Sequence, residues 1–437
     1  MKRRRFLQWA TLGAIGGLTR TVRSAGSRRG ANARVVVVGG GFAGSACALH
    51  LRKFDPDLQV TLIDPDERYF TCPLSNEVLI DERDLASITV TRDGARRAKV
   101  QVIRDRVAGI DARAHEVHLE SKRTLGFSRL VLAPGIRFLT EQIAGYDEQT
   151  AELMPHAWRA GEQTQRLASQ LHQMGEGGVV AISVPAGLYR CPPAPYERAS
   201  LIAHYLAKRK PRAKILIFDS NNHFPKQDLF TAAWQALYPG IIEWIPPAEG
   251  GGVLRIDPST MTLYTASGAH RVAVANLIPP QAPAQLAMDS GLAAGHGWCP
   301  IEPLTFESTL QRDIHVIGDA CIADDMPKSA SAAVSQSRQC ASAIAALLAG
   351  RDVPPPVFDS VCYSAFAPDR GIRIPGHFQV RDGRIQSVSS SPLDGSTRND
   401  ARLPGDSERW YAQIREEAFA PASPTGQRGF AEAPASR

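Results

Sequence analysis

Three cysteines lie in loops whose composition is unusual for buried thiols. Cys72 lies in "YFTCPLSNEV", Cys191 in "YRCPPAPYERAS" and Cys362 in "DSVCYSAFAP". The prolines in these segments argue against simple packing in a core, although a loop cysteine can also be purely structural. A thiolate is a nucleophile, and two thiols can close a reducible disulfide. These three residues are therefore candidates for redox or nucleophilic chemistry.

The other chemically versatile residues give weaker signals. Cys47 and Cys340 fall on apolar faces of predicted helices, and we expect both in the core, as we do Cys299 and Cys321. The eleven histidines are scattered, and no CxxC or HExxH spacing occurs, so no metal site is predicted. Because CxxCH is also absent, we expect no c-type haem on this chain.

Residues 33–67, "ARVVVVGGGFAGSACALHLRKFDPDLQVTLIDPDE", have the pattern of a dinucleotide-binding unit. Four valines predict a buried parallel strand, followed by a glycine turn and a helix. Gly39 permits the tight turn, Gly41 lets the backbone approach a pyrophosphate, and Gly44 lets the helix pack on the strand. Asp64, at the end of the next strand, is placed to accept hydrogen bonds from a ribose. The alternative is a glycine-rich turn that binds no ligand.

Two later segments favour FAD over NAD in this unit. The predicted strand in "FSRLVLAPGIRF" (127–138) ends in Ala-Pro-Gly, where flavoproteins with two dinucleotide domains usually have Ala-Thr-Gly. "TLQRDIHVIGDACIA" (309–323) is similar to the second flavin motif of those proteins, whose Asp holds the ribityl chain. Each segment alone is also compatible with an ordinary buried strand and turn. The residues predicted to contact FAD here are Ala133, Gly135, Gly318, Asp319 and Lys328, the last at the start of a helix whose positive end would face the flavin.

A second dinucleotide unit is predicted near residue 180, but without its fingerprint. The strand "GGVVAISV" (177–184) runs into "PAGLYRCPPAPYERAS", which has four prolines and a cysteine where a glycine turn would be expected. Proline lacks the N–H donor that a phosphate needs. We therefore expect a nucleotide-domain fold in which NAD(P)H is not a substrate.

The N-terminal residues resemble an export signal. Arg3 and Arg4 precede Phe6, and a short apolar run from Trp9 to Leu18 follows. Paired arginines of this kind are typical of a twin-arginine leader, which predicts a periplasmic protein. The run is too short to cross a bilayer, so no integral membrane segment is expected. A disordered basic tail is the alternative, and cleavage after position 26 or position 33 stays open.

Removal of residues 1–33 changes the charge of the chain. The formal net charge is +6, and this segment holds eight Lys and Arg and no acidic residue, so the remainder carries −2. The basic pI of about 9.0 therefore belongs largely to the leader, and no nucleic-acid surface is expected. The remaining chain of roughly 400 residues exceeds one hydrophobic core and predicts two or three domains.

Beyond these patterns, the sequence resembles the flavoprotein (FAD-binding) subunit of flavocytochrome c sulfide dehydrogenase, in the flavin disulfide reductase and sulfide:quinone reductase superfamily. The resemblance runs from about residue 34 to 370, then fades from about 380, although "RWYAQIREEAFA" (409–420) resembles the family's C-terminal Trp-Tyr segment. The segments that carry it are "VVVVGGG", "YFTCPLSNEV", "PHAWRAGEQT", "CPPAPYERAS", "NLIPPQ", "GWCP", "TFES", "HVIGDA", "MPKS" and "CYSAFAP".

The resemblance implies an α/β fold of the glutathione-reductase type, with two Rossmann-like domains and a C-terminal α+β interface domain. The first domain would comprise residues 34–145 and 287–355 and bind FAD. The second would comprise residues 146–286, and the C-terminal domain residues 356–437.

In the family, a cysteine in the Thr-Cys-x-Leu-Ser-Asn-Glu loop is joined by a thioether to the 8α-methyl group of FAD, and two others form a disulfide over the flavin. Matched by motif, these are Cys72, and Cys191 with Cys362. Sulfide would attack the disulfide, leaving a persulfide on Cys191 and a thiolate on Cys362 beside the flavin. Glu197 is a candidate base, or alternatively a surface carboxylate at a helix start. Electrons would pass to a c-type cytochrome on a separate chain.

Two other functions stay open at this point. A sulfide:quinone reductase would have similar cysteines, but it would need an amphipathic C-terminus to bind a membrane, and residues 395–437 read as polar and rich in Pro and Gly. The other is an export-associated electron-transfer or thiol-repair flavoprotein that does not turn over sulfide.

Overall fold

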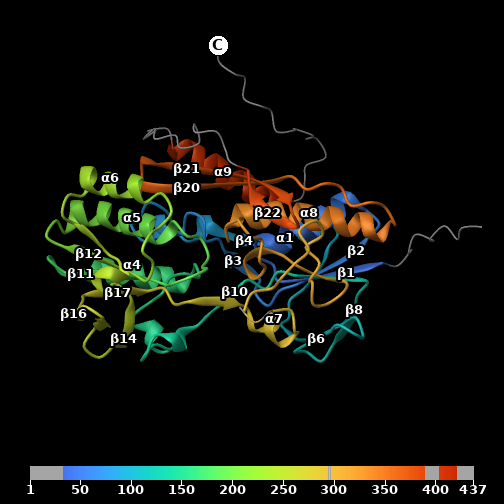
Figure 1. Ribbon diagram of the computed structural model, residues 1–437, viewed down its shortest axis with the longest axis horizontal. Coiled ribbons are helices and arrows are strands. Elements are labelled where there is room, and N and C mark those ends of the chain that lie inside the picture. Colours follow the sequence, from blue (N-terminus) through green and yellow to red (C-terminus); the bar gives the residue numbers. More distant parts are fainter. Residues whose placement is uncertain (1–32, 294, 296, 389–402, 421–437) are drawn as a thin grey trace, which may run out of the picture.

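The computed structural model describes residues 33–293, 295, 297–388 and 403–420. The predicted export signal lies outside the described residues except for Ala33. Much of the polar C-terminal stretch also lies outside them. The described chain forms two lobes side by side, with the C-terminal elements lying across both (Figure 1).

The first lobe is built on a five-stranded parallel sheet in the order β19-β9-β1-β2-β5. Val35, Val36 and Val37 are fully buried, as expected for a strand with neighbours on both sides and helices on its faces. Helices α1 (Phe42–Phe54) and α8 (Ala330–Leu348) pack against each other beside the sheet. The strands are β1 (Arg34–Val38), β2 (Gln59–Ile63), β5 (Gln101–Ile103), β9 (Arg129–Leu132) and β19 (Ile314–Val316).

The second lobe has a four-stranded parallel sheet in the order β13-β12-β11-β17. Its core holds an unusual number of aromatic side chains, including Tyr196, Phe224 and Trp234. The strands are β11 (Val179–Val184), β12 (Lys214–Asp219), β13 (Ile242–Ile245) and β17 (Val274–Leu277); the helices are α4 (Glu162–Gln173), α5 (Ala194–Arg209) and α6 (Gln227–Leu237).

Smaller antiparallel sheets flank the two parallel sheets. One pair, β10 (Ile136–Phe138) with β18 (Gln281–Pro283), joins the two crossings of the chain between the lobes. The other strands are β3 (Arg68–Phe70), β4 (Thr89–Thr91), β6 (Val107–Asp111), β7 (Glu116–Leu119), β8 (Thr124–Gly126), β14 (Val253–Asp257), β15 (Thr262–Thr265) and β16 (Gly268–Arg271). The short helices are α2 (Ser75–Val78), α3 (Asp93–Arg97), α7 (Gln285–Asp289), and the 3₁₀ turns at Ala86–Ile88, Thr140–Gln142, Thr150–Glu152, Pro247–Glu249 and Gly318–Ala320.

A C-terminal antiparallel sheet connects the two lobes. It consists of β20 (Phe358–Ala367), β21 (Arg370–Arg381) and β22 (Arg384–Ser387). Strand β20 packs against α8 of the first lobe and α5 of the second, which Figure 1 shows as a long ribbon crossing both. The start of each of these helices is thereby brought near the same strand.

Helix α9 (Leu403–Phe419) corrects one expectation from the sequence. The stretch 395–437 read as polar, yet α9 buries Tyr411, Ile414 and Ala418 against the first lobe. The ring of Phe419 packs on Phe42 at the start of α1. The apolar residues recur at helical spacing, and isolated polar neighbours masked that pattern.

The predicted fold class is confirmed: two parallel sheets with flanking helices, followed by an antiparallel sheet and a helix, make an α/β protein with two Rossmann-like units. The predicted domain boundaries stay predictions.

Candidate functional site

The turn between β1 and α1 has the geometry that a dinucleotide requires. Gly39 has φ +96°, and a Cβ there would lie 2.2 Å from the carbonyl oxygen of Ala133. A Cβ on Gly44 would lie 1.9 Å from the carbonyl oxygen of Gly39, so helix and turn are in backbone contact. A Cβ on Gly41, by contrast, would meet no atom closer than the Tyr69 hydroxyl at 3.7 Å. The turn is therefore in tight backbone contact at Gly39 and Gly44, whereas at Gly41 it only reaches van der Waals distance of the Tyr69 side chain.

Asp64, at the end of β2, is connected to this turn. Its Oδ2 accepts a hydrogen bond from the backbone N–H of Gly40 at 2.5 Å, and its Oδ1 accepts one from Asp66 N–H at 2.8 Å. The carboxylate is buried but not enclosed, since it retains about a tenth of its residue exposure. Its predicted contact with a ribose stays a prediction.

Arg92 is a functional candidate that the sequence did not reveal. Its side chain is 2% exposed, and one nitrogen approaches Asp64 Oδ2 at 3.3 Å. Nevertheless Nε, Nη1 and Nη2 have no hydrogen-bond partner among the described residues. A buried guanidinium with unpaired donors is costly, which indicates that an anionic or polar group completes the site. The pyrophosphate and ribose of FAD supply such acceptors, so the residues present fit this cofactor.

The second flavin segment folds as a 3₁₀ turn at the end of β19. Gly318 has φ +75°, and its N–H donates to Gln336 Oε1 of α8 at 2.8 Å. Lys328 Nζ donates to the carbonyl oxygens of Asp319 and Cys321, both at 2.8 Å, and lies 3.8 Å from the Trp298 ring centre. Lys328 therefore holds the loop that carries Asp319, and its role as a direct cofactor ligand stays a prediction.

The strand predicted to end in Ala-Pro-Gly also lies at this edge. Ala133 is nearly fully buried under Gly39, and Gly135 adopts φ +69° with open space around it. A left-handed residue explains the glycine, because other residues rarely adopt that conformation. The predicted FAD contacts of both residues are not tested by this geometry.

Cys191 and Cys362 converge at the N-terminus of α8. The backbone N–H of Cys191, which follows β11, donates to the carbonyl oxygen of Lys328 at 2.8 Å. Cys362, on β20, has the hydroxyls of Ser329 and Ser360 beside its sulfur. Ser329 is the residue that caps α8, so both cysteines contact one short segment although they come from distant parts of the chain. Both are thiols in the structure.

Burial raises the pKa of both thiols. For Cys191 the rise is large, and the neighbouring Cys362 and Glu197 add to it by electrostatic repulsion of a second negative charge. For Cys362 the hydroxyls of Ser329 and Ser360 lower the pKa again in part. The assignment of Cys362 as the thiolate side of the pair stays a prediction.

Glu197 lies in the first turn of α5, six residues after Cys191. Burial raises the pKa of Glu197 to about 7, and a hydrogen bond from Asn76 Nδ2 to Oε1 at 3.0 Å opposes that rise. Since it interacts electrostatically with both Cys191 and Cys362, this carboxyl is not a distant surface group. A group that titrates near neutral pH beside two sulfurs can accept or return a proton.

Cys72 lies in the loop after β3, near the same centre. Its Sγ is 3.9 Å from the carbonyl oxygen of Trp158, to which the guanidinium of Arg190 also donates. Burial raises the pKa of Tyr69, as do Cys72 and Asp319, while Arg190 lowers it. These electrostatic contacts bring Cys72, Tyr69 and Asp319 to one site from separate segments.

The second βα turn, between β11 and α5, is occupied by protein side chains. At the end of β12, Asp219 is fully buried and corresponds in position to Asp64. Its carboxylate accepts hydrogen bonds from Tyr196 at 2.6 Å and from Trp244 at 2.8 Å, as well as from Asn221. The Tyr196 ring stacks on Phe224 with centres 3.7 Å apart. The acid that corresponds to Asp64 is thus already bonded to protein side chains.

The remaining features lie outside this centre. Cys47, Cys299, Cys321 and Cys340 are buried, as predicted. Within the part of the chain that the structure describes, no cluster of three or more His, Cys, Asp or Glu could hold a metal ion. No described helix combines the length and the apolar character needed to cross a membrane.

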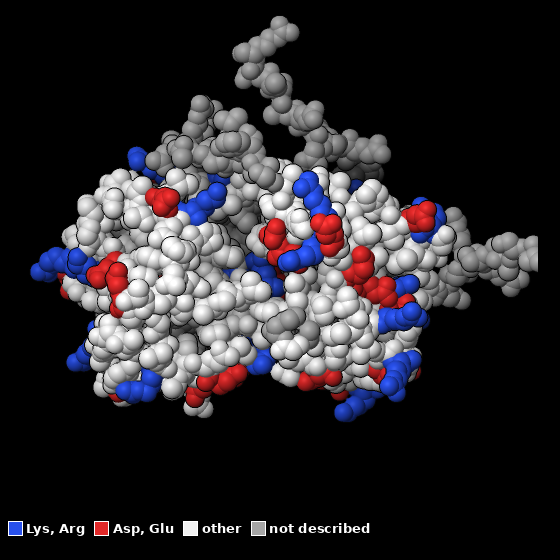
Figure 2. All heavy atoms as spheres, viewed as in Figure 1, with Lys and Arg blue, Asp and Glu red and all other residues white. Residues whose placement is uncertain are grey.

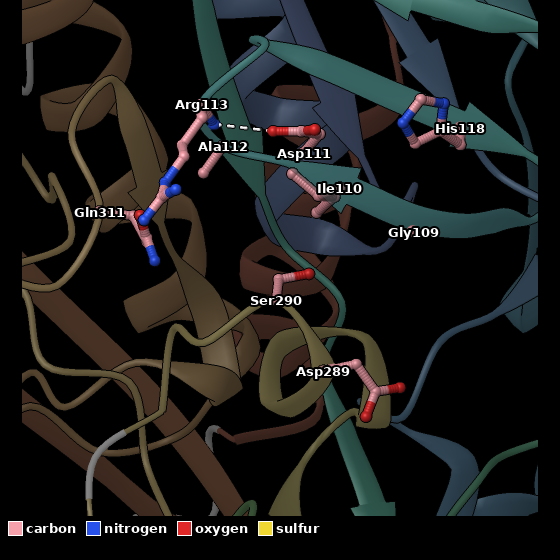
Figure 3. A pocket seen from close by; sticks show the side chains of 9 residues that line it. All are labelled: Gly109, Ile110, Asp111, Ala112, Arg113, His118, Asp289, Ser290 and Gln311. Atoms are coloured by element: carbon pink, nitrogen blue, oxygen red, sulfur yellow. Dashed lines mark hydrogen bonds between the residues drawn. The ribbon is translucent and has the colours of Figure 1, made fainter.

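The surface away from the cysteine centre carries an open pocket and a mixed distribution of charges. An open pocket of about 470 Å³ between the β6–β7 hairpin and α7 is lined by polar and apolar residues alike, and it shares no residue with the cysteine centre (Figure 3). Its Asp111 is engaged by the backbone N–H of Arg113 at 2.9 Å. On the face shown in Figure 2, acidic and basic side chains are interspersed, and wide areas carry neither.

Three family models match this chain in order. The pyridine nucleotide-disulphide oxidoreductase model matches residues 33–182. The central model of the sulfide dehydrogenase [flavocytochrome c] flavoprotein chain matches 164–279, and the flavocytochrome c sulphide dehydrogenase flavin-binding model matches 354–419. The last match includes α9, so the resemblance continues beyond residue 380, where the sequence had suggested that it fades.

Individual relatives agree with these matches. The sulfide dehydrogenase [flavocytochrome c] flavoprotein chain of Chlorobaculum thiosulfatiphilum is 58% identical over 45 residues, which is 10% of this chain and 94% of that sequence. A sulfide-quinone reductase of Aquifex aeolicus is 29% identical over 184 residues, 41% of each chain. The solved structure of the Aquifex aeolicus sulfide:quinone oxidoreductase superposes with a TM-score of 0.68 at 17% identity, covering 90% of this chain and 93% of that one.

These findings support FAD as the cofactor and sulfide oxidation as the class of reaction. The fold confirms the α/β class, and the site brings the predicted cysteines together. The chain belongs to the family of flavocytochrome c sulfide dehydrogenase flavoprotein chains.

Proposed function

We propose that this protein is the FAD-bearing subunit of a periplasmic sulfide dehydrogenase that passes electrons to a c-type cytochrome on a separate chain. The observation that carries the proposal is the convergence of Cys191 and Cys362 on Lys328 and Ser329, beside Glu197. Such a pair of sulfurs, closed as a disulfide, is an electrophile suited to HS⁻.

FAD would be held along the edge of the first sheet. Gly41 gives access to its pyrophosphate, with Asp64 at the adenosine ribose, Arg92 close to both, and Asp319 towards the flavin end. Cys72 would form a thioether with the 8α-methyl group, which retains the cofactor outside the cytoplasm. When bound, the flavin accepts an electron pair and releases it as single electrons.

The chain's own residues would carry the sulfur chemistry. HS⁻ attacks the Cys191 sulfur of the disulfide, a new S–S bond forms, and the Cys191–Cys362 bond breaks. Cys191 then holds a persulfide, and Cys362 leaves as a thiolate, stabilised by the hydroxyls of Ser329 and Ser360. Glu197 takes the proton of H₂S or of the persulfide, because its pKa of about 7 leaves it partly ionised at neutral pH.

The location and acceptor complete the proposal. Arg3 and Arg4 head a sequence of the twin-arginine type, which exports folded proteins with their cofactors in place. The periplasm is oxidising, so a disulfide between Cys191 and Cys362 persists there. A cytochrome partner is implied by the family's flavocytochrome name, and it would supply the haem that this chain's sequence does not attach.

The decisive experiment compares cysteine variants in sulfide-dependent reduction of cytochrome c. Cys362→Ser and Cys191→Ser should fold and retain flavin but lose at least about a thousandfold in kcat/KM, since no electrophilic sulfur remains. Cys47→Ala, which alters a buried cysteine of α1, is the matched control and should retain activity. Near-wild-type turnover by Cys362→Ser, or two free thiols in non-reducing peptide maps of the resting protein, would refute the disulfide mechanism.

Quinone reduction is the second candidate, favoured by the 29% identity to a sulfide-quinone reductase. Against it, the apolar face of α9 is packed on the protein through Tyr411, Ile414 and Ala418 rather than presented to a membrane. Parallel assays with cytochrome c and a short-chain ubiquinone decide between the two. A preference for the quinone would replace the acceptor proposed above.

A further inference from the structure

Arg190 and Cys72 both contact the same residue, Trp158. Its guanidinium donates to the carbonyl oxygen of Trp158, the same oxygen that lies 3.9 Å from Cys72 Sγ. The Trp158 indole N–H donates back to the carbonyl oxygen of Arg190 at 3.2 Å, and the Arg190 N–H is fixed by Gln281 Oε1 at 2.9 Å. The guanidinium and the thiol therefore meet at one carbonyl oxygen.

The position is not that of a structural arginine. The guanidinium of Arg198, which is buried in this region, donates hydrogen bonds to Asn76, Asn276 and the carbonyl oxygens of His156 and Ala157. Within the described residues, the side chain of Arg190 has one hydrogen bond, to Trp158. Its other N–H groups remain available for electrostatic interaction with the acidic groups around it.

Anionic or acidic groups surround this guanidinium. Burial lowers the pKa of Arg190, but Cys72, Asp319 and Tyr69 outweigh it and raise the pKa overall, with Cys72 the strongest of the three. Arg190 also directly precedes Cys191, so its loop is already part of the centre.

We propose that Arg190 promotes the attachment of the flavin to Cys72, by fixing the carbonyl oxygen against which the sulfur lies and by keeping a positive charge at that point. The inference rests on the covalent link of the proposed function and adds the residue that positions the sulfur. A Lys in its place would keep the charge, whereas a Gln would keep only hydrogen-bonding capacity.

The chemistry of attachment balances with dioxygen as the oxidant. The S–H bond of Cys72 and one C–H bond of the 8α-methyl group break, and a C–S bond forms. Two protons and two electrons are released, and the electron pair passes through the flavin ring to dioxygen, which becomes hydrogen peroxide. No other reactant is needed.

The test measures covalent flavin rather than turnover. Full-length wild type, Arg190→Gln, Arg190→Lys and the control Arg159→Gln are purified, precipitated with acid, and assayed for flavin in pellet and supernatant. Arg159 is an exposed arginine of the neighbouring loop, so its variant has the same change of charge. We expect about one covalent flavin in wild type and the control, at least a tenfold lower covalent fraction in Arg190→Gln with its flavin released, and substantial recovery in Arg190→Lys.

The Arg190→Lys variant separates the role of the charge from a mere loss of structure, because lysine keeps the positive charge but not the planar donors of arginine. Equal covalent flavin in Arg190→Gln and wild type overturns the inference while leaving the covalent link intact. So does an equal loss in Arg190→Lys and Arg190→Gln, or a variant that binds no flavin at all, which would make Arg190 a binding residue. Absence of covalent flavin from wild type overturns both the link and the inference.

Discussion

The two parallel sheets of this protein carry the same kind of βα turn, and they use it in opposite ways. In the first lobe Asp64 accepts hydrogen bonds from two backbone N–H groups, and the buried Arg92 beside it has donors without hydrogen-bond partners among the described residues. In the second lobe the corresponding acid, Asp219, is fully buried and bonded to Tyr196 and Trp244. The polar groups at the first turn leave donors available to a ligand, whereas the acid at the second turn is satisfied by protein side chains.

The second turn carries a cysteine and a carboxyl group that could take part in sulfur chemistry. Cys191 stands where a phosphate-binding glycine would be expected, in the left-handed conformation with φ +56°, and Glu197 follows in the first turn of α5. A non-glycine residue in this conformation is strained, and such strain is often found at functional sites. The comparison teaches that a nucleotide fold can retain its sheet and yet present a sulfur pair in place of a second dinucleotide.

The largest expected effect on stability comes from a glycine-to-alanine substitution in the first turn, compared with the same substitution in the second. Gly39→Ala places a Cβ 2.2 Å from a backbone oxygen, so we expect a loss of about 3 kcal/mol or more in unfolding free energy, together with loss of flavin. Gly187→Ala, at φ +77° in the second turn, meets no atom within 4 Å and should cost about 1 kcal/mol with flavin retained. Denaturant unfolding and flavin content measure both. Equal losses would contradict the contrast between the turns.

The two acids should differ in what their removal costs. Asp219→Ala leaves the buried donors of Tyr196 and Trp244 unpaired, so we expect about 2–4 kcal/mol of destabilisation. Asp64→Asn retains an oxygen for Gly40 N–H and should change stability less, but it should weaken FAD about tenfold or more. Thermal melts of flavin-free protein and FAD titration in a Cys72→Ser background test this. A flavin loss confined to Asp219→Ala would reverse the assignment of the ligand site.

Glu197→Gln should remove a pH-dependent limb of activity. Because burial raises the pKa of Glu197 to about 7, the wild-type base becomes ionised, and kcat/KM rises, as pH increases through 7. The Gln variant should lack this limb and lose about 10–100-fold at neutral pH. Titration of sulfide itself is common to both proteins, so the difference between their profiles isolates Glu197.

The same substitution should alter the pH dependence of stability. The folded pKa of Glu197 lies above its ordinary value of 4.5, so the protonated carboxyl is the favoured folded form. Wild-type stability should therefore fall relative to Glu197→Gln as pH rises from about 4.5 to 7. Parallel profiles of melting temperature for the two proteins would contradict this account of the carboxyl.

The smallest expected effect is none at all: NADH and NADPH should not reduce the flavin. Tyr196 and Trp244 already occupy the acid Asp219 at the second turn, and the prolines before α5 offer few N–H donors to a phosphate. Anaerobic stopped-flow mixing checks this by flavin absorbance, with sulfide as the positive control. Rapid bleaching by NADH would mean that the second turn still binds a dinucleotide.

Local patterns were predictable because their chemistry is local. Gly39, Gly44 and Asp64 lie within one strand-turn-helix-strand unit, so their spacing alone indicates the ligand class. The proline-rich turn before α5 likewise indicated the missing phosphate cradle. The burial of Cys47 and Cys340 followed from helical periodicity in α1 and α8. Helix α9 was missed because its apolar residues stand among charged neighbours.

Only the tertiary structure decided the rest. Arg92 and Arg190 are ordinary arginines in the sequence. Arg92 becomes a candidate because it is buried without a hydrogen-bond partner among the described residues, and Arg190 because it lies at the Trp158 carbonyl. Cys191 and Cys362 could be paired beforehand only through a family resemblance. Strand β20 brings them together by crossing α5 and α8, a contact between distant segments that no local spacing encodes. The sequence by itself determined which ligand and sulfur chemistry is available, and long-range packing determined which side chains share one site.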